Sequence, residues 1–257
     1  MDLASVVAGA LTGFVVGLTG VGGGALMTPI LLLVLGVAPM TAVGTDLWFA
    51  ALTKLTISGL HVRARIIDWP IVAWLWLGSL PAALATVVWM ASHPSDPATI
   101  ALIRTAIGGA VCLAALSLLA RGWLTSGQAP DAEASALKVS ALTIAAGALL
   151  GVLVALTSVG AGAIGAVWLY HLYPRRLTPV RLVATDIAHA IPLALCAGIG
   201  HLAIGQVDAT LLRDLLAGSI PAALLGASLS TRVPHAWLAR ALGVVLLVIG
   251  LTMLTRG

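Results

Sequence analysis

The chain has 257 residues, of which 60% are hydrophobic and only 9% are charged, and its formal net charge is +4. A soluble domain carries about 25% charged residues, so no water-soluble fold could bury this much apolar surface. We interpret the small positive charge as loop bias that orients a membrane protein, and not as a surface for nucleic acid.

Apolar stretches recur along the whole sequence, and each is long enough to cross a hydrocarbon core of about 30 Å, which takes roughly 20 helical residues. They are continuously apolar, whereas the strands of a membrane barrel alternate over about ten residues. We therefore predict an all-α, multi-pass integral protein of the cell membrane, the inner membrane in a bacterium. The stretches are 4–36, 39–60, 69–92, 98–120, 137–172, 180–203, 209–231 and 236–255.

The sequence contains an internal duplication. Gly-Ala-Leu-Thr-Gly at 9–13 matches Gly-Ala-Leu-Leu-Gly at 147–151, an offset of 138 residues. Further matches share an offset of 140, and this constancy indicates duplication, because shared membrane composition does not align aspartates and histidines. The matching pairs are Pro39 with Pro179, Thr45 with Thr185, Asp46 with Asp186, His61 with His201, Asp68 with Asp208, and 78–84 with 218–224.

Lys and Arg accumulate in cytoplasmic loops, and this rule favours one topology. If all eight stretches cross the membrane, the basic residues divide six against six. If 4–36 and 137–172, both interrupted by glycines, return to the side they entered, the division is nine against three. The halves are then inverted repeats, each a glycine-broken re-entrant segment plus three transmembrane helices. The predicted organisation of the single membrane domain 1–257 is repeat one 1–122, a flexible linker 123–137, and repeat two 138–257.

A glycine motif lies near the middle of each re-entrant segment, Thr19-Gly-Val-Gly-Gly-Gly24 in the first and Thr157-Ser-Val-Gly-Ala-Gly162 in the second. A broken helix frees backbone N–H groups and presents the positive end of a half-helix, which suits an anion. Glycines also allow close helix packing, but the duplicated motif with its hydroxyls favours a binding site. The predicted substrate-binding residues are Thr19, Gly20, Gly22, Gly23, Gly24, Thr157, Ser158, Gly160 and Gly162.

Ionisable side chains within the apolar stretches are few, and a charge at the centre of a bilayer costs at least about 2.5 to 3.5 kcal/mol. Asp186 and His189 share a helix face, whereas Lys54 lies two turns from Asp46. We hypothesise that Lys54 neutralises an Asp of the other half or the bound anion, and that an Asp or His carries a coupling proton. A structural ion pair between the halves is an equal alternative. The predicted coupling or charge network is Thr45, Asp46, Lys54, Thr185, Asp186 and His189.

The sequence predicts no metal site, cofactor or catalytic centre. Cys112 and Cys196 lie inside apolar stretches as packing residues, and the histidines lack ligand spacing. We expect His61 and His201, at equivalent helix ends where water is near, to act as caps. Neither a His-Glu-x-x-His pattern nor a Gly-x-x-x-x-Gly-Lys loop for ATP is present.

Together these motifs resemble the sulfite exporter TauE/SafE family of bacterial permeases over nearly the whole length. The resemblance rests on Gly17-Leu-Thr-Gly-Val-Gly-Gly-Gly24 followed by Pro29, on Ala42-Val-Gly-Thr-Asp46, and on a degenerate second copy from Gly151 to Thr185. It implies export or uptake of sulfur-containing anions such as sulfite or organosulfonates, driven by an ion gradient. The chain departs from the family pattern at Asp46, where many members have Ser, and at Ala161.

We therefore predict a secondary transporter whose partners are the lipid bilayer, a small anion and a coupling proton or sodium ion. A channel or a non-transporting membrane scaffold is the main alternative, and an intramembrane enzyme is less favoured. The sequence leaves open the direction of transport, the coupling ion, homo-oligomerisation and the protonation of Asp46 and Asp186.

Overall fold

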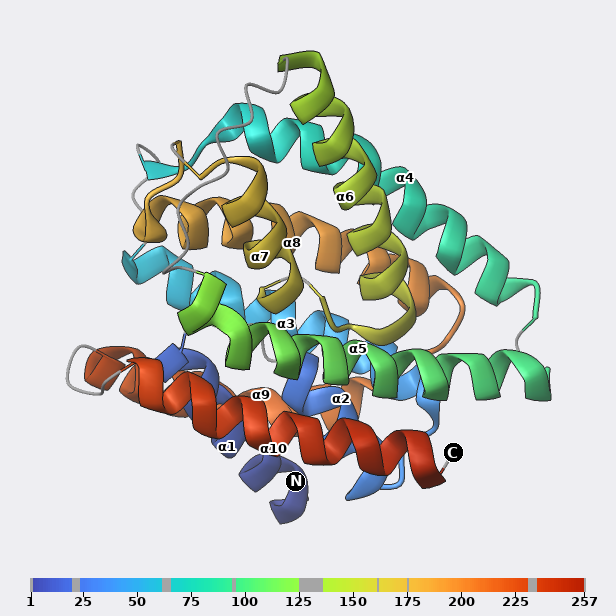
Figure 1. Ribbon diagram of the computed structural model, residues 1–257. Helices are drawn as coiled ribbons and strands as arrows, with labels where there is room; N and C mark the ends of the chain where they lie inside the picture. The colour runs from blue at the N-terminus through green and yellow to red at the C-terminus, as the bar shows by residue number, and fades with distance from the viewer. Residues whose placement is uncertain are drawn as a thin grey trace.

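The computed structural model describes residues 2–19, 24–61, 66–93, 96–124, 136–160, 162–174, 176–230 and 235–256. These residues form helices joined by short turns, without a strand among them, which confirms the all-α prediction (Figure 1). The helices are α1 (Leu3–Thr19), α2 (Gly24–Leu33), α3 (Pro39–His61), α4 (Trp69–Ala91), α5 (Pro97–Leu124), α6 (Ala136–Thr157), α7 (Ala163–Leu172), α8 (Pro179–Ala203), α9 (Ala209–Leu229) and α10 (His235–Arg256).

Six helices of the described residues are long and apolar enough to cross a membrane, namely α4, α5, α6, α8, α9 and α10. The two stretches predicted to be broken, 4–36 and 137–172, are each divided into a longer helix and a ten-residue helix, α1 with α2 and α6 with α7. The second glycine motif forms the turn between α6 and α7 where the sequence predicts it, whereas residues 20–23 of the first motif lie outside the described part of the chain. The predicted linker falls between α5 and α6, but residues 125–135 lie outside the described part, and the exact bounds of the two repeats stay a prediction.

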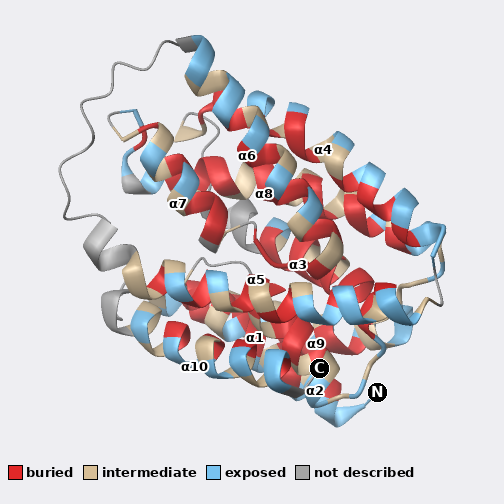
Figure 2. Ribbon diagram, turned by 45° about the vertical axis from the view of Figure 1, so that its right-hand side comes forward, coloured by how far each residue is buried: buried red, intermediate tan, exposed pale blue. Residues whose placement is uncertain are grey.

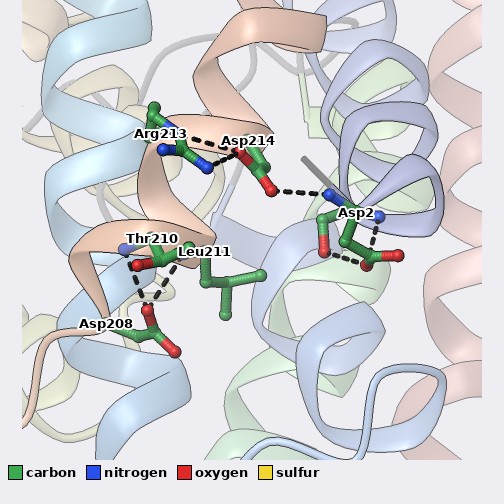
Figure 3. A network of polar contacts seen from close by, with 7 residues as sticks. Asp2, Asp208, Thr210, Leu211, Arg213 and Asp214 are labelled. Carbon is green, nitrogen blue, oxygen red and sulfur yellow. Dashed lines mark hydrogen bonds and ion pairs between the residues drawn. The ribbon is translucent and has the colours of Figure 1, made fainter.

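Proline and aspartate residues set where several helices begin. Proline lies at the first residue of α3, α5 and α8 and at the second of α4, where its fixed φ suits a helix and its missing N–H is not needed. Asp208 precedes α9 and accepts hydrogen bonds from the N–H groups of Thr210 and Leu211, both at 2.9 Å (Figure 3). This is an N-cap, which satisfies donors that the first turn leaves without helical partners.

The helices pair across the two halves. The principal pairs are α1 with α9, α4 with α6, α5 with α10, and α3 with α8, and Figures 1 and 2 both show α5 and α10 side by side. Gly9 on α1 approaches α9 so closely that a Cβ there would lie 2.0 Å from the Leu215 carbonyl oxygen. At Gly147 on α6, the equivalent position, a Cβ would lie 2.4 Å from the carbonyl oxygen of Leu75 on α4. The duplicated glycines thus make the same close contact twice.

The directions of these pairs follow from their contacts. Near the start of α3, Thr41 bonds to Gln206, just after the end of α8, and two turns later Trp48 bonds to the Gly198 carbonyl within α8. These two helices, which occupy equivalent places in the duplication, therefore run antiparallel.

Buried residues gather where the two halves meet, and exposed residues follow the outer faces of the helices (Figure 2). The exposed faces are themselves apolar, which is typical of a surface that contacts lipid. On α10, for example, Val244, Val245, Val248 and Leu251 are all exposed. The polar residues described next lie in the interior between the halves.

Candidate functional site

The start of α2 meets the turn between α6 and α7 inside the molecule. Gly24, the first residue of α2, lies against the turn that follows α6, where a Cβ on Gly24 would lie 2.0 Å from the Ser158 carbonyl oxygen. One turn further along α2, the Thr28 hydroxyl oxygen lies 3.3 Å from the Thr157 carbonyl oxygen. The structure therefore brings together two motifs that the sequence places in different halves. Of the predicted site residues, Gly20, Gly22 and Gly23 lie outside the described part of the chain.

The turn between α6 and α7 has an unusual backbone. Gly160 and Gly162 have φ angles of 132° and 122°, which favour glycine, and Ser158 has a φ of 59°. A left-handed conformation is uncommon for a residue with a side chain, and such strain concentrates at functional sites. The Ser158 hydroxyl oxygen is buried and interacts with the Asp46 carboxylate, although it has no hydrogen bond of good geometry among the described residues. It can therefore donate either to that carboxylate or to a ligand.

The other hydroxyls of the glycine motifs bond to nearby backbone. The Thr157 hydroxyl oxygen lies 2.6 Å from the Leu153 carbonyl, to which it donates, and accepts the Val159 N–H at 3.1 Å. The Thr19 hydroxyl donates to the Val15 carbonyl at 2.7 Å. The Thr157 hydroxyl thus links the last turn of α6 to the residue after Ser158 and stabilises the turn in which Ser158 lies.

Asp46 lies beside this meeting point. It is fully buried on α3, and one of its carboxylate oxygens, Oδ2, is hydrogen bonded to the Thr28 hydroxyl. The carboxylate also interacts with the Ser158 hydroxyl, although its other oxygen, Oδ1, has no hydrogen bond of good geometry within the described residues. Asp186, its equivalent on α8, lies beside α7, because a Cβ at Gly165 would lie 2.6 Å from an Asp186 carboxylate oxygen. Each aspartate is therefore next to the ten-residue helix of its own half.

Lys54 connects the two aspartates electrostatically. It is 8% exposed, and its ammonium group interacts with the carboxylates of Asp186 and Asp46. His189 also interacts electrostatically with Lys54, and its Nε2 atom lies 3.0 Å from the Ser79 hydroxyl oxygen. Four of the six residues of the predicted charge network are thus brought into one buried cluster. No group of three or more His, Cys, Asp or Glu residues in the described chain could hold a metal ion.

The other two predicted members, Thr45 and Thr185, lie elsewhere and make equivalent contacts between the halves. The Thr45 hydroxyl accepts the Asp208 N–H at 3.0 Å, and the Thr185 hydroxyl accepts the Asp68 N–H at 3.1 Å. Both threonines are fully buried. They hold α3 to the start of α9 and α8 to the start of α4.

One histidine is not where the sequence predicts. His201 was expected near water, but its side chain is fully buried, and its Nε2 atom lies 3.0 Å from the Ala155 carbonyl oxygen of α6. The expectation of nearby water is wrong for this side chain: α8 itself ends among exposed residues, but the imidazole faces inward and meets a carbonyl in the last turn of α6. The side chain of His61 lies outside the described part.

An ion pair joins the halves at Asp68, and within the described residues the equivalent Asp208 has no such pair. The Asp68 side chain is 3% exposed and accepts two hydrogen bonds from Arg176, both at 2.7 Å, with Arg181 at 3.6 Å. Accepting these hydrogen bonds, Asp68 raises the pKa of the Arg176 guanidinium. The equivalent Asp208 caps only its own helix, and Figure 3 shows the Asp2, Asp214 and Arg213 network nearby.

Asp68→Asn is expected to lower the midpoint of thermal unfolding in detergent by roughly 4 to 8 °C. Hydrogen bonds to charged groups contribute about 1.5 to 3 kcal/mol, and 1 kcal/mol corresponds to about 2 to 4 °C in a chain of this size. Asp208→Asn is the matched control, and it should change the midpoint by only about 1 °C because asparagine also caps helices well. Equal decreases in the two variants would contradict the assignment of the ion pair as a link between the halves.

Some polar residues of this interior were not predicted from the sequence as site residues. They are Thr28, Ser79, and the pair Thr53 and Ser219, whose hydroxyls lie 3.2 Å apart. A signal for two of them exists, because Ser79 and Ser219 occupy the same place in the duplicated Gly-Ser-x-Pro segment. No pattern marks Thr28, whose importance follows only from the fold of α2 onto Asp46.

Apolar membrane-spanning helices around a buried polar interior, shared between two duplicated halves, define a multi-pass membrane transport protein. Residues 5–253 match the family described as Sulfite exporter TauE/SafE, and the chain belongs to this family. It is a membrane transporter, in agreement with the sequence prediction.

Two bacterial proteins are similar to the chain over nearly their whole length. The "Probable membrane transporter protein YjnA" of Bacillus subtilis (strain 168) is 37% identical over 260 residues, which cover 99% of this chain and 100% of that protein. The "Probable membrane transporter protein YdhB" of the same organism is 28% identical over 247 residues, 95% and 96% of the two chains. No solved structure shows a significant match.

Proposed function

We propose that this transporter is a secondary carrier of small sulfur-containing anions, such as sulfite or organosulfonates, and that the anion binds where α2 meets the Ser158 turn. The observation that carries the proposal is the contact of Gly24 with Ser158. It brings the start of α2 and the turn after α6, which belong to different halves, to one point close to the cluster that contains Lys54. The family name, sulfite exporter, supports the choice of substrate class.

The donors at this point match the acceptors of an oxyanion. The Ser158 hydroxyl can donate one hydrogen bond, and the N–H groups in the first turn of α2 carry the partial positive charge of a helix N-terminus. Lys54 supplies a full positive charge in surroundings from which water is largely excluded. A sulfite or sulfonate group has several oxygen acceptors on one sulfur atom, so it can bond to these donors together.

The arrangement of the halves supports alternating access. Equivalent helices α3 and α8 run antiparallel through the interior, which supports the predicted inverted repeats, and the threonine contacts at Asp208 and Asp68 are reciprocal. In carriers of inverted repeats, one bundle rocks against the other around a site near the midplane. The Asp68 ion pair to Arg176 would then keep one end closed, and within the part of the chain that the structure describes Asp208 has no such pair, so the two ends differ.

Counterflow in proteoliposomes tests this proposal. Vesicles that contain the purified protein and an excess of unlabelled sulfite or alkanesulfonate should transiently accumulate the labelled anion from outside, whereas a channel or a scaffold gives no such overshoot. Ser158→Ala should raise the half-saturation concentration of the anion about tenfold or more, since a hydrogen bond to a charged group contributes about 1.5 to 3 kcal/mol.

The matched control is Ser117→Ala on α5, whose hydroxyl donates to the Ala114 carbonyl at 2.7 Å away from the site. This variant should transport like the wild type. If the wild type shows no counterflow of either anion although the protein is folded, the proposed function is wrong. If Ser158→Ala and Ser117→Ala behave alike, the carrier stands but the anion binds elsewhere.

A further inference from the structure

We propose that Asp46 is the proton-binding residue of this carrier, and that one proton moves in the same direction as each monovalent anion. The inference rests on the proposed function, because it assigns the coupling ion of the same site. Four observations carry it: the burial of Asp46, the position of Thr28 between two acceptors, the balance of charges around Lys54, and the place of Asp46 beside α2.

The Thr28 hydroxyl lies between two groups that both accept hydrogen bonds. Its oxygen is hydrogen bonded to Asp46 Oδ2 and lies 3.3 Å from the Thr157 carbonyl oxygen. A hydroxyl has one hydrogen to donate, so it cannot serve an ionised carboxylate and a carbonyl at the same time. If Asp46 is protonated, its O–H donates to Thr28, and Thr28 then donates to Thr157. With a proton on Asp46, the chain from Asp46 through Thr28 to Thr157 is complete, and the carboxyl group can still accept a hydrogen bond from the Ser158 hydroxyl.

This chain of hydrogen bonds links the proton to the anion site. Thr28 belongs to α2 of the first half, and Thr157 ends α6 of the second half, immediately before Ser158. With Asp46 protonated, the hydrogen bond from Thr28 to Thr157 holds α2 against the turn that presents the Ser158 hydroxyl. When Asp46 is ionised, the Thr28 hydrogen turns to the carboxylate and this link between the halves is lost. Proton binding therefore assembles the site, and proton release opens it.

The charges near Asp46 also favour an exchange of negative charge, in which Asp46 becomes neutral by protonation and the bound anion supplies the negative charge instead. Lys54 acts directly on Asp46, and Asp186 and His189 interact with Lys54. With both aspartates ionised, the formal charge of Lys54, Asp46 and Asp186 is −1, taking His189 as neutral. Protonation of Asp46 removes one negative charge and a bound monovalent anion restores it. The empty and the loaded carrier then have the same charge, which avoids an additional charge in the membrane interior.

Other ionisable groups on the helices around α3 do not change this balance. These helices are α2, α5, α6, α8 and α9, and α2 has no ionisable residue. On α5 and α6, Arg104 and Lys138 are exposed. On α9, Arg213 bonds to Asp214 at 3.0 Å. The remaining groups on α8 have partners already described, Arg181 at Asp68 and His201 at the Ala155 carbonyl.

The transport step balances in atoms and charge. On the side from which the anion enters, a hydronium ion transfers a proton to Asp46, forming an O–H bond at Oδ2, and the anion binds beside α2. After the halves rearrange, this O–H bond breaks, the proton passes to water on the opposite side, and the anion leaves. An ionised Asp46 next to the start of α2 repels an anion, so the anion does not bind without the proton.

The experiment uses the full chain in proteoliposomes and an alkanesulfonate, which stays ionised at the test pH and cannot itself carry the proton. An interior more alkaline by one pH unit should drive about tenfold accumulation of the sulfonate, because one unit equals 1.36 kcal/mol. A pH-sensitive dye should report one proton for each sulfonate that enters. Asp46→Asn should abolish both effects but retain measurable counterflow at equal pH, since asparagine can donate to Thr28 as the protonated acid does.

Asp96→Asn, at the start of α5, is the matched control and should remain coupled to protons. Thr28→Val should reduce the pH-driven accumulation, and Thr28→Ser should restore it, which provides a second test if Asp46→Asn fails to fold. Proton coupling that persists in Asp46→Asn, or wild-type counterflow without any effect of pH, overturns this inference and leaves the proposed function intact. Wild-type protein without counterflow overturns both.

Discussion

Replacement of Lys54 by methionine, an unbranched side chain one atom shorter and without charge, is expected to reduce sulfonate counterflow about 100-fold. Hydrogen bonds that involve charged groups contribute about 1.5 to 3 kcal/mol, and every 1.4 kcal/mol is a factor of ten in binding. Lys54 is buried and interacts with Asp186 and Asp46. Its removal leaves two carboxylates and an incoming anion without a positive partner. The measurement is the initial rate of counterflow at several anion concentrations.

The double variant Lys54→Met with Asp186→Asn separates transport from stability. Removing one member of a buried ion pair costs about 3 to 5 kcal/mol, and replacing both members is often nearly neutral. The single variant is therefore expected to be poorly stable in detergent, and the double variant is expected to regain stability without regaining counterflow. Recovery of both would show that Lys54 and Asp186 form only a structural pair. Full counterflow in a folded Lys54→Met variant would exclude Lys54 from the mechanism.

Much of the fold follows from the sequence because the membrane imposes strong constraints. Continuous apolar stretches predict helices, and the glycine motifs predict the interruptions between α1 and α2 and between α6 and α7. The inverted orientation of the halves rests on loop charges and on the antiparallel packing of α3 and α8, and it stays a prediction to be tested by topology mapping.

The candidate site is only partly predictable from the sequence. Asp46, Lys54, Asp186 and His189 stand out because ionisable residues are rare in apolar stretches, and the structure places them in one cluster. Their partners do not stand out, because threonine and serine hydroxyls find hydrogen-bond acceptors on helices throughout a membrane protein. Thr28 acquires a role only through contacts 18 residues away at Asp46 and 129 residues away at Thr157. The surroundings of His201 were not predicted for the same reason, since its partner, the Ala155 carbonyl, lies 46 residues away on another helix.

Gly24→Ala is expected to have a large effect for a steric reason. The added Cβ would lie 2.0 Å from the Ser158 carbonyl oxygen and 3.1 Å from its hydroxyl oxygen. Because the first of these contacts is with backbone, α2 must move away from the turn, and overpacking of this kind costs about 1 to 3 kcal/mol. We expect counterflow to fall about tenfold or more. The displacement also separates Thr28 from Thr157, so pH-driven accumulation should fall by a larger factor than counterflow.

Gly109→Ala on α5 is the matched control, because a Cβ at Gly109 meets no atom within 4 Å. Alanine has a higher helix propensity than glycine by about 1 kcal/mol, so this variant should be at least as stable as the wild type and equally active. If Gly24→Ala and Gly109→Ala transport alike, α2 does not need to lie against Ser158 and the anion site is misplaced. If Gly24→Ala lowers counterflow and pH-driven accumulation by the same factor, the link from Asp46 through Thr28 to the turn is not the coupling element, because displacing α2 has then weakened only anion binding.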